Sequence, residues 1–75
     1  MNSTALSVIN DPVISLDRKI LLLCDMEKQT VSYIASLRMR NVREKGLQKF
    51  EEYLTFLSEQ IEKLKQERIQ RRKRG

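Results

Sequence analysis

The side chains that could carry chemistry in this 75-residue sequence are one cysteine, ten carboxylates and a basic run near the C-terminus. The sequence has no histidine and no glycine-rich phosphate-binding loop, and its spacing does not indicate a convergent pair of carboxylates. Cys24 ends an apolar run that begins at Ile20, where a cysteine behaves as a small hydrophobic side chain. The usual zinc ligands and an internal disulfide are both missing. We therefore expect no enzymatic activity, no metal or other cofactor, and no small-molecule substrate.

The basic run is the motif that suggests contact with an anion. Residues 1–67 hold ten basic and ten acidic side chains, so the net charge of +5 lies entirely in residues 68–75. Short Lys/Arg-rich runs import proteins into the nucleus, contact nucleic acid or contact acidic surfaces, although many are only solvated ends. We treat residues 68–75 as a basic tail, and its candidate contacts are Arg68, Arg71, Arg72, Lys73 and Arg74.

Helix association is the interaction that the remaining sequence favours. From residue 47 to residue 64 every a and d position of a heptad repeat is apolar, the pattern by which one helix packs against another. We call this set the seam, and we expect it to form a partner interface through Leu47, Phe50, Leu54, Leu57, Ile61 and Leu64.

The elements that position these residues are predicted to be two helices in an all-α fold. Asp11 and Pro12 predict a helix over residues 12–41, with Ser15 and Asp17 as a competing start. The seam predicts a second helix over residues 47–70, and residues 1–11 are expected to be disordered.

The first helix carries a wider apolar band than the second. We expect its partner interface to comprise Leu16, Ile20, Leu23, Glu27, Val31, Ile34 and Leu37, and a further set beside it includes Leu22, Met26 and Tyr33. A buried carboxylate must be paired or neutralised. Glu27 therefore either meets a basic residue of a partner chain or marks a place where the band is open to water.

The segment between the helices is predicted to be a turn. The heptad register slips by one residue between Leu37 and Leu47, Gly46 lies at the slip, and Asn41 suits a left-handed C-cap. We expect an antiparallel helical hairpin with a body over residues 12–67. One long, interrupted helix is the alternative.

A single hairpin would leave part of its apolar surface uncovered. A turn centred near residue 44 sets Ile34 opposite Leu54, but leaves Leu16, Ile20 and Leu23 without apolar cover. A domain this small, with no disulfide or metal, is marginally stable. We therefore expect other helical chains to complete an intermolecular coiled coil or helical bundle, with a hetero-oligomer favoured and a homo-oligomer as the alternative. Phe56, far from the seam, would add a second contact surface.

These patterns predict a small non-catalytic structural or adaptor subunit. The alternative is a dimeric coiled-coil protein that binds nucleic acid through its basic tail. The longest apolar run has five residues, too few for a membrane span, and no secretory signal pattern is present. We expect an intracellular protein, and the basic tail favours the nucleus over the cytoplasm.

Overall fold

Helices make up most of the chain in a computed structural model, which describes residues 2–74 and the side chains of residues 4–73. The elements are α1 (Asn2–Asn10), α2 (Leu16–Met39) and α3 (Glu44–Arg74), and the described residues form no strand. The all-α prediction is confirmed. The expectation of two helices is wrong, because most of the supposedly disordered residues 1–11 are helical; Met1 lies outside the described residues.

The linker between α1 and α2 explains why α2 begins later than residue 12. The Asp11 carboxylate accepts a hydrogen bond from the Val13 N–H at 2.9 Å, so it stabilises a local turn instead of capping a helix. Ser15 is the N-cap, and its hydroxyl accepts a hydrogen bond from the Arg18 N–H at 3.2 Å. The competing start at Ser15 is therefore the one that the chain uses.

Helix α1 is too short to be stable in isolation and is held by contacts with the rest of the chain. Its Ala5 is fully buried in the core, and Ile9 packs against the same core. Lys19 of α2 donates a hydrogen bond from Nζ to the Ile9 carbonyl oxygen at 2.8 Å, which satisfies one of the last carbonyls of α1.

The turn after α2 is a Schellman motif. Asn41 adopts a left-handed conformation with φ of 60°, and its N–H donates to the Arg38 carbonyl at 3.1 Å. The Val42 N–H donates to the Leu37 carbonyl at 3.2 Å, which completes the pattern. The chain then enters α3 at Glu44, three residues before the predicted start.

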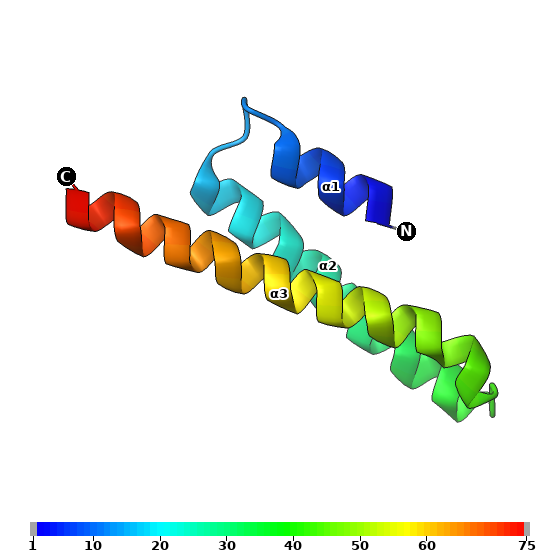
Figure 1. The fold of residues 1–75 in the computed structure, drawn as a ribbon. Coiled ribbons are helices and arrows are strands. Elements are labelled where there is room, and N and C mark those ends of the chain that lie inside the picture. Colours follow the sequence, from blue (N-terminus) through cyan, green and yellow to red (C-terminus); the bar gives the residue numbers. More distant parts are fainter. Residues whose placement is uncertain (1, 75) are drawn as a thin grey trace.

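Helices α2 and α3 run side by side in opposite directions, and α1 lies along the N-terminal part of α2 (Figure 1). Ion pairs connect α2 and α3 near both ends: Arg38 to Glu51 at 2.7 Å and Asp17 to Arg68 at 3.3 Å. The molecule has extents of 50 × 20 × 16 Å.

The core lies where α1, α2 and α3 meet, toward the end remote from the turn. Leu23 and Leu57 are fully buried there, with Ala5, Ile20, Ile61 and Leu64 around them. The expectation that Leu16, Ile20 and Leu23 lack cover on their own chain is therefore wrong. Ile20 and Leu23 are buried and Leu16 is half-buried, because α1 supplies a third layer that the sequence analysis did not anticipate.

The left-handed residue in the turn yields a prediction about stability. Replacing Asn41 by alanine should lower the free energy of unfolding by about 1 kcal/mol, because a Cβ without a local hydrogen-bonding group disfavours positive φ. Asn41→Gly is the matched control and should leave stability equal or slightly higher. Chemical denaturation monitored by circular dichroism measures both. Equal losses in the two variants would contradict the left-handed assignment.

Candidate protein-interaction surface

The residues predicted to form a partner interface lie mostly inside the chain itself. Those buried are Ile20, Leu23, Ile34, Leu47, Leu57, Ile61 and Leu64. Those half-buried are Leu16, Glu27, Leu37, Phe50 and Leu54, and only Val31 is exposed, at 50%. The seam is thus occupied by α1 and α2 of the same chain. Phe56 is half-buried and packs against the core, so the expectation that it forms a separate contact surface is wrong.

Glu27 finds a partner on α3. The Ser58 hydroxyl donates a hydrogen bond to Glu27 Oε2 at 2.7 Å, across the interface between α2 and α3. This contact satisfies a half-buried carboxylate oxygen without a basic residue of another chain. Glu27 therefore contributes to the pairing of α2 with α3.

The basic tail is the last part of α3, and its cations divide into two groups. Arg68 is half-buried and pairs with Asp17, while Arg71 is exposed and pairs with Glu67 at 2.7 Å. Arg72 and Lys73 are exposed and form no ion pair with any described residue. The Arg74 side chain and Gly75 lie outside the described part of the structure.

The part of the α2–α3 pair that α1 does not cover lies toward the turn (Figure 1). There α2 and α3 form only a two-helix layer, and they enclose a groove of about 320 Å³. We call it the aromatic groove, and its lining residues are Met26, Gln29, Thr30, Tyr33, Phe50 and Tyr53. The rings of Tyr33 and Phe50 meet edge to face across the two helices, with centroids 5.0 Å apart.

A second groove of about 400 Å³ is lined by other residues of the same two helices, among them Val31, Ala35 and Leu54. The Arg38 and Glu51 side chains, which form an ion pair, also line it. Exposed apolar side chains therefore accompany two separate hollows in the half of the molecule near the turn.

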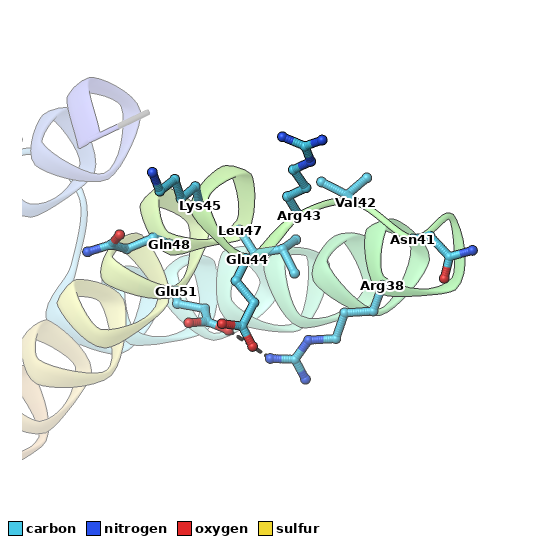
Figure 2. A pocket seen from close by; sticks show the side chains of 9 residues that line it. All are labelled: Arg38, Asn41, Val42, Arg43, Glu44, Lys45, Leu47, Gln48 and Glu51. Atoms are coloured by element: carbon cyan, nitrogen blue, oxygen red, sulfur yellow. Dashed lines mark hydrogen bonds and ion pairs between the residues drawn. The ribbon is translucent and has the colours of Figure 1, made fainter.

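The turn itself bounds a hollow of about 770 Å³ with both basic and acidic lining residues. Figure 2 shows Arg38 reaching toward Glu51, whereas Arg43 points away from that pair. Because the Arg38 guanidinium is already paired and Glu44 also lines the hollow, its charges do not converge on one point. The hollow gives no specific support to anion binding.

The aromatic groove is not predicted as a site by the sequence. Met26 and Tyr33 were noted as a set beside the main band, and a spacing of three joins Phe50 to Tyr53. Those spacings place each set on one face of its helix. The groove could not be predicted because the sequence does not reveal the extent of α1, which determines how much of the α2–α3 pair lies under a third helix.

Comparisons of the chain with protein-family models, with curated proteins and with solved structures found no match. Within the described residues, no helix is long and apolar enough to cross a membrane. The same residues contain no group of three or more potential metal-ligating His, Cys, Asp or Glu side chains.

The intramolecular position of the seam yields a second prediction. Leu57→Ala should lower the free energy of unfolding by about 2–5 kcal/mol, because it leaves a cavity at a fully buried position. Leu21→Ala is the matched control, since Leu21 is 60% exposed on α2, and it should cost less than about 0.5 kcal/mol. Urea denaturation measures both values. Similar small losses would mean that the seam is not packed within the chain.

Proposed function

We propose that this chain is a small, non-catalytic structural or adaptor subunit that contributes an α2–α3 helical hairpin to a bundle with other protein chains. The observation that carries the proposal is that α1 packs on only one end of the α2–α3 hairpin. Helix α1 completes a three-helix core at one end, whereas the half near the turn consists of α2 and α3 alone. A third helix from another chain would complete that half in the same way.

The exposed apolar side chains support this assignment. Tyr33 and Val31 are each 50% exposed on the two sides of α2, and Met39 is 86% exposed at its end. Single exposed apolar residues are ordinary, but these accompany two grooves in one half of the molecule.

The assembly test uses the tagged chain expressed in its source cells, with the mass of the purified species measured by light scattering. We expect a complex heavier than the 8.9 kDa chain that contains at least one other protein in fixed ratio. Tyr33→Asp should dissociate it, because the substitution places a charge where an apolar contact forms. Ser32→Asp, one position away and exposed, adds the same charge and should leave the complex intact. A monomer from the source cells would overturn the proposal.

A second candidate function is nucleic-acid binding by a dimer that uses the basic tail, which also underlies the proposed nuclear location. The observation that favours it is the position of Arg72 and Lys73. Helix α3 extends beyond the start of α2 (Figure 1), and both cations are exposed without an ion pair among the described residues. Such cations can contact phosphates without first breaking a contact within the chain.

Two matched double substitutions test this candidate. Arg72→Gln with Lys73→Gln should weaken binding to a duplex of about 20 base pairs and reduce the slope against log salt by about 2. Arg68→Gln with Arg71→Gln removes the same charge from residues already paired with acids, and should have a smaller effect. Fluorescence anisotropy at several salt concentrations measures the slopes. Identical slopes for the wild type and both variants would exclude phosphate contact by the tail.

A further inference from the structure

The aromatic groove continues the layer that α1 occupies. Met26 and Tyr53 pack against the core cluster that contains Ala5, and both residues also line the groove. The groove therefore starts where α1 ends and follows the same side of α2 and α3 toward the turn. A nine-residue helix spans about 14 Å, while the 24 residues of α2 span about 36 Å. About 20 Å of the third layer is empty, which is the length of a helix of about 14 residues.

The floor and walls of this groove suit apolar side chains. Thr30 is 8% exposed, and its hydroxyl donates to the Met26 carbonyl of the preceding turn at 2.8 Å. The Thr30 hydroxyl therefore already has a hydrogen-bond partner and does not need one from water. The edge-to-face contact of Tyr33 with Phe50 spans the two helices and leaves Tyr33 half exposed. An incoming aliphatic side chain would cover this contact.

Helical spacing places exposed basic residues on the groove's side of the molecule, beyond the residues that line it. Arg40 is the C-cap of α2 and follows Tyr33 by seven residues, or about two helical turns. On α3, Lys45 and Lys49 precede Tyr53 by eight and four residues, so the three residues lie on one face of the helix. All three cations are exposed and none forms an ion pair within the described residues. An occupant with acidic flanks would be electrostatically complementary to these cations.

We propose that the aromatic groove binds an amphipathic helix of another protein, about 14 residues long, with aliphatic residues facing the groove and Asp or Glu residues on its flanks. This inference rests on the proposed function and specifies the chemistry of the partner. A second copy of the chain fits less well. Its α1 carries no charged residue and is packed in its own core, so it does not supply a free helix with acidic flanks.

The test uses two display libraries of helical peptides of about 14 residues, each with randomised Leu, Ile, Val, Met or Phe along one stripe. In one library the flanking positions are Glu, and in the other they are Lys. We expect the full-length chain to select binders from the Glu library only. In NMR spectra, the amide signals that shift on binding should cluster at residues 26–33 and 50–53.

Charge reversal of these cations provides the decisive variant. Arg40→Glu with Lys49→Glu should weaken the selected Glu-flanked peptides by about tenfold or more and allow selection from the Lys library. Lys28→Glu with Lys63→Glu is the matched control, because it changes the same net charge at exposed positions on the same two helices. This control should leave peptide affinity within about threefold of the wild type.

Four outcomes would overturn the inference. Two concern selection: no binders from either library, or binders from the Lys library with the wild-type chain. The other two are equal effects of the two double variants, and a homodimer that Tyr33→Ser dissociates. A source-cell complex that survives Arg40→Glu with Lys49→Glu would refute this inference while leaving the proposed function intact. If Glu-flanked peptides bind but no source-cell complex exists, the groove chemistry stands and the proposed function fails.

Discussion

The burial of Leu23 and Leu57 in one core cluster, to which α1 contributes Ala5, is the constraint on which the rest of the structure depends. These two leucines are fully buried, and the other core residues surround them. Removing a leucine of this kind from water contributes about 1.5–3 kcal/mol, a large share of the stability available to a domain of this size. Helix α1 contributes to this burial, because its Ala5 is fully buried in the same cluster and its Ile9 packs against it. The shortest helix thus determines which half of the chain has a closed core.

The polar contacts along the α2–α3 pair fix its alignment more than they add stability. The Asp17–Arg68 and Arg38–Glu51 ion pairs are largely exposed, and exposed pairs contribute about 0–1 kcal/mol each. Between them, the Ser58 hydroxyl meets the Glu27 carboxylate. A shift of α3 by one residue would rotate its seam by about 100° and separate these partners. Apolar burial supplies the free energy, and the polar contacts select one register.

Much of the helical organisation could be predicted from spacing, but the packing of those helices could not. The heptad positions of α3 correctly identified side chains that become buried, and Asn41 does adopt the left-handed conformation that its residue type allows. The choice between Asp11 and Ser15 as the N-cap depended on a local hydrogen bond to Val13 that the sequence pattern does not reveal. Helix α1 was missed because nine residues without charge or a cap signal do not predict an isolated helix. That omission led directly to the expectation that Leu16, Ile20 and Leu23 need a partner chain, and it concealed the aromatic groove.

Because α1 packs on only one end of the α2–α3 pair, local stability should differ along the pair. Opening of a segment costs less where fewer apolar contacts hold it, so the half near the turn should open more readily than the half under α1. The Schellman motif at Asn41 and the Tyr33–Phe50 contact oppose this opening without closing the layer. A helix bound in the aromatic groove would add apolar contacts where the chain has fewest. Its binding free energy would then stabilise the two-helix half as well as hold the partner, by the same linkage that couples any ligand to the folded state. The three-helix end has its own closed core, so the stabilisation from such a bound helix would act chiefly on the two-helix half.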